Sequence, residues 1–115
     1  MTFHPEDWQV LTSESQLATI AEESHQQPVL IFKHSTRCGI SANALDKLTA
    51  AWDLSAEKVK GYYLDLIAYR SVSNAIAVTF AVPHQSPQVL LIKDGKAVYH
   101  TSHYAIEIKG IKAAL

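Results

Sequence analysis

The chain has 115 residues, 48% hydrophobic and 18% charged, which suits one domain with a hydrophobic core and is too apolar for a disordered chain. Its net charge of −1 argues against a nucleic-acid-binding protein, which would need a basic face. A single cysteine, no secretory signal and no apolar run long enough to span a bilayer together predict a cytoplasmic protein without internal disulfides or a membrane partner.

The first half of the chain alternates between expected strands and helices. A short strand at 8–11 precedes a helix that is capped by Thr12 or Ser13 and runs to about Gln26. Residues 28–33 form a nearly continuous apolar run, which is typical of a strand buried on both faces. A polar turn at 34–37 then leads into a helix at 38–54, whose apolar residues follow one stripe.

The second half continues this alternation. We expect a strand at 59–66, a helix at 68–81, a loop rich in helix breakers at 82–87, a strand at 88–92, a returning strand at 96–101 and a helix at 104–115. The Asp94-Gly95 pair predicts a hairpin turn between the last two strands. This order predicts one α/β domain over residues 1–115, with a mixed sheet of about five strands flanked by four helices.

Cys38 stands where the 28–33 strand gives way to a helix. A helix start offers unpaired N–H groups and a partial positive charge, and Arg37, Lys33 and His34 add positive potential. These surroundings favour the thiolate, which is the nucleophile in disulfide exchange. The alternative is that Cys38 is a small buried hydrophobic residue.

The motif that contains this cysteine is Cys38-Gly39-Ile40-Ser41. Positions 38 and 41 lie one helical turn apart, so we expect the Ser41 hydroxyl to face the Cys38 sulfur and to donate a hydrogen bond to its thiolate. A serine cannot resolve a mixed disulfide, and the chain has no other cysteine. The sequence therefore predicts a monothiol mechanism with Cys38 and Ser41 as the catalytic residues.

Ser86-Pro87 opens the fourth main strand after a loop and is predicted to be a cis peptide bond facing Cys38. In that arrangement the Ser86 backbone could pair with an extended thiol substrate. The alternative is a trans proline that merely begins a strand.

The six histidines raise the question of a metal site. Neither C-x-x-C nor H-x-x-x-H spacing occurs, so we predict no metal centre. His34, His84 and His103 are all expected at the Cys38 end of the sheet. Ser102-His103, at the start of the expected last helix, is predicted to hold the acidic part of a small thiol, or else Ser102 is only a helix cap.

Three segments of the chain carry a resemblance to a known family: residues 32–41, residues 69–77, and residues 84–92 continuing to Ser102-His103. Together they resemble the monothiol bacilliredoxin family over nearly the whole chain. The resemblance implies a thioredoxin fold and the removal of bacillithiol from S-thiolated cytoplasmic proteins by Cys38. It also implies a low-molecular-weight thiol, bacillithiol or possibly glutathione, as co-substrate, with no permanently bound cofactor. The expected substrate-binding residues are Lys33, His34, Arg37, Gly39, Ile40, His84, Ser86, Pro87, Ser102 and His103.

One position departs from that family, which usually has proline where this chain has Gly39. Cys-Gly-Ile-Ser resembles the Cys-Gly-Phe-Ser of monothiol glutaredoxins, which hold iron–sulfur clusters together with glutathione. Those proteins usually carry a Gly-Gly pair where this chain has residues 101–103. The alternative function is therefore an iron–sulfur or thiol-binding module without turnover.

Overall fold

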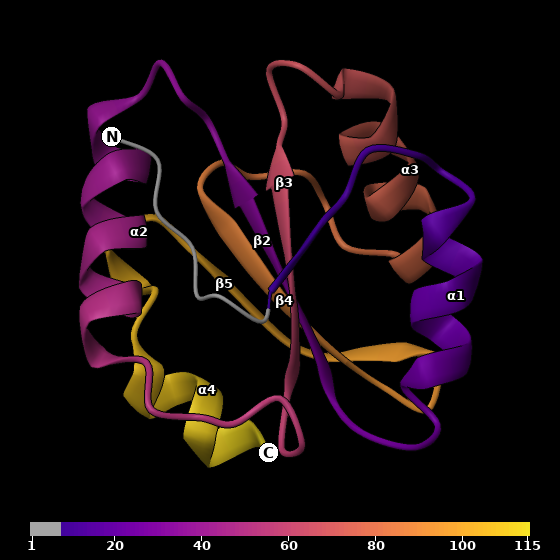
Figure 1. Ribbon diagram of the computed structural model, residues 1–115. Helices are drawn as coiled ribbons and strands as arrows, with labels where there is room; N and C mark the ends of the chain where they lie inside the picture. The colour runs from indigo at the N-terminus through magenta and orange to yellow at the C-terminus, as the bar shows by residue number, and fades with distance from the viewer. Residues whose placement is uncertain (1–7) are drawn as a thin grey trace.

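The computed structural model describes residues 8–115, which form one five-stranded sheet with helices on both faces (Figure 1). The strands are β1 (Gln9–Val10), β2 (Val29–His34), β3 (Lys60–Asp65), β4 (Gln88–Lys93) and β5 (Lys96–Ser102). The helices are α1 (Gln16–Glu23), α2 (Gly39–Ala51), α3 (Arg70–Phe80) and α4 (Ile108–Ala114), with a short 3₁₀ turn η1 (His103–Ala105). The α/β architecture predicted from the sequence is confirmed.

The strand order across the sheet is β1-β3-β2-β4-β5. β3 pairs in parallel with β1 and β2, because helices α1 and α2 carry the chain back between these strands. β4 runs antiparallel to both β2 and β5. Asp94 and Gly95 join β4 to β5 with φ angles of 52° and 77°, the positive values that a tight hairpin turn requires.

Strand β2 lies in the centre of the sheet, and all six of its residues are buried. α2 and α4 cover one face of the sheet, and α1 and α3 cover the other (Figure 1). Both faces of β2 therefore contact apolar side chains, which explains why its sequence is a continuous apolar run instead of an alternating one. The carboxyl end of this strand delivers the chain directly to Cys38.

Two helix boundaries near the start of the chain differ from the expected ones. α1 begins at Gln16, because the Gln16 side-chain oxygen accepts the backbone N–H groups of Thr12 (2.8 Å) and Ser13 (3.0 Å) and holds them in a turn. α2 ends at Ala51, because Trp52 takes an extended backbone conformation and packs edge-on against Trp8, with 5.0 Å between ring centroids.

The last helix also begins later than expected. α4 starts at Ile108, and the residues before it include η1, whose first residue His103 has a φ of 55°. The left-handed backbone at His103 interrupts any helix that would start there. Within residues 8–115, no helix has the length and apolar content that crossing a membrane would take.

Candidate active site

Cys38 is the N-cap residue of α2, with an extended backbone (φ −120°, ψ 121°). Its own N–H donates to the Ser35 carbonyl oxygen at 3.2 Å, and its carbonyl accepts the Ala42 N–H at 3.1 Å. The next three N–H groups, at residues 39–41, have no acceptor inside the helix. Cys38 is thus a partly exposed residue at the positive end of the α2 dipole.

The residues that flank Cys38 in the chain are accessible to solvent. Arg37, Gly39 and Ile40 are all exposed. A Cβ atom placed on Gly39 would meet nothing within 4 Å. These three predicted substrate contacts therefore lie on accessible surface beside the thiol.

Ser41 does not lie on that surface. Its side chain is fully buried, and its Oγ accepts the Ser35 backbone N–H at 2.9 Å and lies 2.6 Å from His34 Nδ1. No hydrogen bond joins Ser41 to Cys38 within the part of the chain that the structure describes. The expected hydrogen bond from Ser41 to the Cys38 thiolate stays a prediction, and in this structure the Ser41 hydroxyl contacts His34 and the Ser35 backbone instead.

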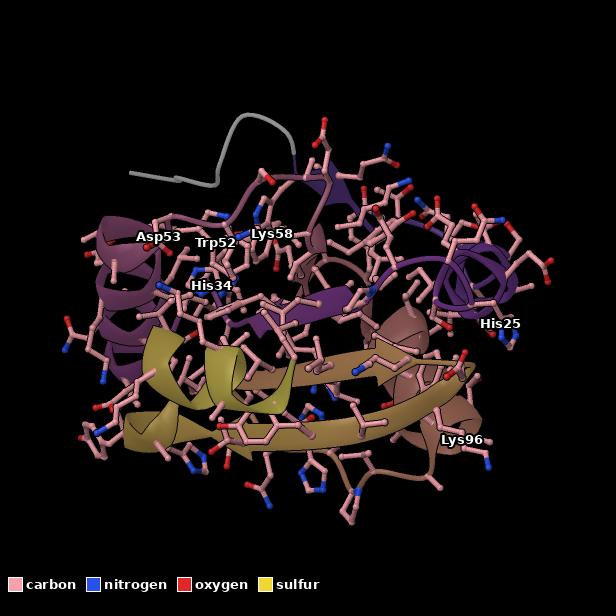
Figure 2. All side chains as sticks on the ribbon, turned by 90° about the horizontal axis from the view of Figure 1, so that it is seen from below. His25, His34, Trp52, Asp53, Lys58 and Lys96 are labelled. Atoms are coloured by element: carbon pink, nitrogen blue, oxygen red, sulfur yellow. The ribbon has the colours of Figure 1, made fainter. Side chains whose placement is uncertain are left out.

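His34, predicted as a substrate contact, is only 7% exposed. It lies on the α2 side of the sheet (Figure 2), with its ring 5.8 Å from that of Tyr63. Burial lowers the pKa of His34 below its usual 6.5, while the carboxylates of Asp65 and Asp46 partly oppose that shift. His34 is thus a buried partner of Ser41, and this structure offers little His34 surface for the predicted contact with substrate.

Lys33 is also buried, with no exposed surface. Successive strand residues point to opposite faces, so Lys33 lies on the face opposite to His34, beside its cross-strand partner Gln88. Its Nζ has no hydrogen-bond partner within residues 8–115, and burial lowers the pKa of Lys33 to about 8. Lys33 has no exposed surface, so this structure offers no support for the predicted contact between Lys33 and substrate.

The loop before β4 meets the end of β5 next to the active end of the sheet. The Ser86-Pro87 bond is cis, as the sequence predicted. The Pro87 carbonyl oxygen accepts the His103 N–H at 3.1 Å, so these two predicted residues are direct neighbours. Ser102 pairs with Gln88 in the sheet and ends β5. Ser102 is therefore not the start of the last helix, which begins six residues later at Ile108.

His84 is exposed and lies on the other side of this loop. Its Nδ1 is 3.4 Å from Ser73 Oγ in α3. The pKa of His84 is lowered, mainly by partial burial and further by the positive charges of Lys33 and Arg70. His84 is thus placed toward α3 and the covered Lys33, which is the face of the sheet that does not carry α2.

A cavity of about 260 Å³ lies beside the start of α2. It is lined by Ile40, Asn43, Ala44, Lys47, His103 and Tyr104. Lys47 Nζ donates to the Tyr104 carbonyl oxygen at 3.3 Å and lies 3.7 Å from a Glu107 carboxylate oxygen. The sequence analysis identified Ile40 and His103 but missed Asn43 and Lys47. These two residues stand four positions apart in α2, a spacing that puts them on one face of the helix.

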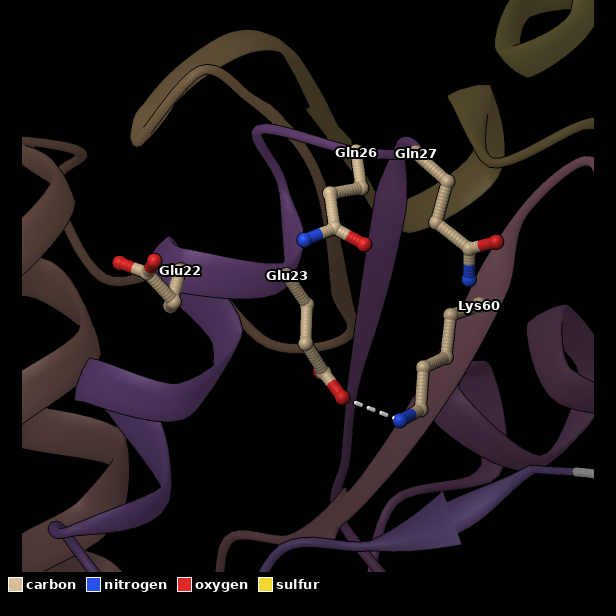
Figure 3. Close-up of a pocket in the computed structure, with 5 residues that line it drawn as sticks. All are labelled: Glu22, Glu23, Gln26, Gln27 and Lys60. Carbon is tan, nitrogen blue, oxygen red and sulfur yellow. Dashed lines mark hydrogen bonds and ion pairs between the residues drawn. The ribbon is translucent and has the colours of Figure 1, made fainter.

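A second cavity, of about 310 Å³, lies at the opposite end of the sheet, where β3 begins (Figure 3). Glu23 and Lys60 form an ion pair there, and the Tyr62 hydroxyl donates to Glu23 at 2.6 Å. This cavity is remote from Cys38, which follows the other end of β2. No group of three or more His, Cys, Asp or Glu side chains with the geometry of a metal site occurs in residues 8–115.

Comparisons with known protein families and solved structures identify proteins that are similar to this chain. A family model described as monothiol bacilliredoxin BrxC matches residues 9–111. A solved structure described as a candidate oxidoreductase with a thioredoxin fold is 32% identical to this chain, with a TM-score of 0.80 over 94% of this chain and 93% of that one.

Two more distant solved structures share the fold alone. Thioredoxin from Fasciola hepatica is 23% identical, with a TM-score of 0.68 over 92% of this chain and 95% of that one. Thioredoxin NaTrxh from Nicotiana alata is 18% identical, with a TM-score of 0.70 over 97% and 94%. The fold is a thioredoxin fold, and family and fold together support a thiol oxidoreductase-like role. The chain belongs to the monothiol bacilliredoxin family.

Proposed function

We propose that this protein is a monothiol thiol–disulfide oxidoreductase that removes bacillithiol, or a similar small thiol, from mixed disulfides on cytoplasmic proteins. The observation that carries the proposal is the position of Cys38, the single cysteine of the chain, as the half-buried N-cap of α2. A thiol in that position is stabilised as a thiolate and is accessible to a disulfide. Membership of the monothiol bacilliredoxin family supports the same reaction.

The proposed reaction has two exchange steps. The Cys38 thiolate attacks the small-thiol sulfur of the mixed disulfide, and the bond from that sulfur to the substrate protein breaks. The substrate cysteine leaves as a thiolate and takes a proton from water, while Cys38 holds the small thiol in a new disulfide. A second small thiol, as its thiolate, then attacks the held small-thiol sulfur, releasing the Cys38 thiolate and a small-thiol disulfide.

The small thiol would dock in the cavity beside the start of α2. Ile40 lies two residues after Cys38, and the Asn43 amide and Lys47 ammonium follow on the same helix. His103 faces this cavity from the other side and is hydrogen-bonded to the loop that contains Ser86 and Pro87. This set of apolar, amide and cationic groups suits a small thiol with a polar, acidic end.

The reaction is tested by intact mass after incubation with a bacillithiolated test protein. The wild-type protein is expected to gain the mass of one bacillithiol while the test protein loses it, and Cys38→Ser is expected to do neither. A glutathionylated test protein in a parallel arm identifies which small thiol is preferred. If the Cys38→Ser variant still removes the thiol, the mechanism is wrong. If anaerobically purified protein is coloured and shows no transfer, a cluster-binding module is supported instead.

The docking site is tested with Lys47→Ala and with Lys109→Ala, an exposed lysine on α4 outside this cavity, as the matched control. Loss of a polar contact should cost about 1 kcal/mol, or several-fold in rate at low substrate concentration. We expect Lys47→Ala to react more slowly with the acidic small-thiol disulfide and normally with a neutral aromatic disulfide. Equal rates for both variants with both disulfides would exclude docking in this cavity.

A further inference from the structure

The proposed reaction uses only the sulfur of Cys38, yet two polar side chains, His34 at the end of β2 and Ser41 in the first turn of α2, are buried in contact with each other. Ser41 Oγ lies 2.6 Å from His34 Nδ1 and accepts the Ser35 N–H at 2.9 Å. Ser41 is fully buried and His34 is 7% exposed. Buried polar groups with such short contacts have few ways to place their protons, so the positions of those protons can be worked out.

A serine hydroxyl has one proton and two acceptor lone pairs. The Ser35 N–H takes one lone pair. If the neutral His34 ring carries its proton on Nε2, Nδ1 is an acceptor, and the Ser41 proton is used in the contact with it. If Nδ1 carries a proton, it donates to Ser41 Oγ, and the Ser41 proton is free to point elsewhere.

Cys38 is the reactive residue that stands three positions before Ser41 in the chain. Residues 38 and 41 lie one turn apart at the start of α2, where i and i+3 side chains are neighbours. A hydrogen bond from a hydroxyl to a thiolate stabilises the charged sulfur. The protonation of His34 can thus decide whether the thiolate receives that bond.

We propose that His34 is a positioning residue that sets the direction of the Ser41 hydroxyl and thereby controls the acidity of the Cys38 thiol. With Nδ1 unprotonated, His34 withholds the Ser41 proton from the sulfur. With Nδ1 protonated, or with the imidazole removed, Ser41 is free to donate to the thiolate. This inference rests on the proposed function only in that Cys38 reacts as a thiolate.

The groups around His34 define when each state occurs. Asp65 is its neighbour in the β2–β3 pairing, and Asp46 on α2 is also close enough to raise its pKa. Tyr63 on β3 packs against the ring, and the Cys38 thiol follows in the chain. Burial outweighs the two carboxylates and keeps the His34 pKa below 6.5, so the ring is neutral at neutral pH and becomes charged in the acidic range.

The test measures the alkylation rate of Cys38 by iodoacetamide against pH in four proteins: wild type, His34→Phe, Ser41→Ala and the double variant. Phenylalanine keeps an aromatic ring against Tyr63 but cannot bind the Ser41 proton. We expect His34→Phe to move the midpoint of the alkylation curve to lower pH, with up to about tenfold more thiolate below it. In the Ser41→Ala background the same change should have no effect, because no hydroxyl remains to be released. An equal shift in both backgrounds, or a shift to higher pH, would overturn the proposal.

Two further measurements guard against misfolding of these variants. His34→Gln offers an amide oxygen that can accept the Ser41 proton, so it should restore the wild-type midpoint. In the unaltered protein, ¹⁵N NMR of the His34 ring at neutral pH should show the proton on Nε2, and a proton on Nδ1 would refute the scheme. None of these experiments uses bacillithiol, so their failure is distinct from failure of the proposed function.

Discussion

The carbonyl oxygen of Cys38 accepts the backbone N–H of Ala42 at 3.1 Å, so Cys38 closes the first turn of α2 while its own backbone stays outside the helix. Gly39 is therefore the first residue of the helix. This is the position where proline is most favoured in helices, because its missing N–H has no partner there in any case. The Cys38 backbone (φ −120°, ψ 121°) is also one that a residue before proline adopts readily.

Gly39→Pro should therefore stabilise the protein by about 0.5–1 kcal/mol, chiefly by restricting the unfolded chain. It should also slow alkylation of Cys38 at neutral pH, because one N–H at the helix start is lost. Urea denaturation and iodoacetamide kinetics measure the two effects. Gly39→Ala is the control, since its Cβ meets nothing within 4 Å and its N–H is kept. A proline variant less stable than wild type would show that the backbone at Gly39 does not have the conformation of a first helical residue.

Ser41→Cys places a second thiol one turn from Cys38. After reaction with a small disulfide, the variant should release the small thiol and end as an internal disulfide, whereas the wild type should keep a stable adduct. Loss of the hydroxyl contacts to His34 and Ser35 should lower the free energy of unfolding by about 1–2 kcal/mol.

Intact mass and urea denaturation check both parts of this prediction. Ser41→Ala is the control, because it loses the same hydrogen bonds and adds no thiol. A persistent adduct on Ser41→Cys would mean that a thiol at position 41, buried beside His34, cannot reach the sulfur of Cys38.

The order of strands and helices could be predicted because, in most elements, the spacing of apolar residues is typical of that type of secondary structure. The continuous apolar run that became β2 is an example, and its six buried residues agree with it. Some element ends depend on distant contacts instead. The spacing of Trp52 is compatible with the preceding helix, and its contact with Trp8, far away in the sequence, is visible only in the fold.

The same division holds at the site. The position of Cys38 at a helix start follows from local sequence, but the partner of Ser41 depends on how the turn at 35–38 folds α2 back onto the end of β2. Lys33 at the end of an apolar strand is expected to reach solvent with its amine. Its burial depends on elements much later in the chain, including β4, where Gln88 is its neighbour. Such pairings have no signal in the sequence around residue 33.

Gly61 should tolerate no side chain, because the indole ring of Trp8 lies directly on it. Gly61→Ala is expected to lower the free energy of unfolding by about 1–3 kcal/mol, since the new methyl group would displace the Trp8 ring and disturb its packing on Trp52. Urea denaturation followed by tryptophan fluorescence measures the loss. Gly39→Ala serves again as the control at an open position, and equal stability of the two variants would contradict close packing at Gly61.

The buried Lys33 should make stability depend on pH. Burial lowers the pKa of Lys33 to about 8 in the folded protein, against 10.5 for an ordinary lysine. Between these values the unfolded chain binds more protons than the folded one, so the free energy of unfolding rises as pH increases. The whole pKa difference corresponds to at most about 3 kcal/mol. The free energy of unfolding is lower by this amount at neutral pH than at a pH where Lys33 is uncharged.

Lys33→Met, which keeps a long side chain without the charge, should therefore be more stable than the wild type at neutral pH. The gap between the two proteins should narrow as the pH rises to about 9.5, because deprotonation removes the cost of burying the amine in the wild type. Tyr62 and Tyr63 also have raised pKa values, but their effect on stability is common to both proteins and cancels in the comparison. Urea denaturation across this range measures the gap. A gap that stays constant with pH would show that Lys33 titrates like an exposed lysine, and a wild type more stable than Lys33→Met at neutral pH would show that its amine has a partner when folded.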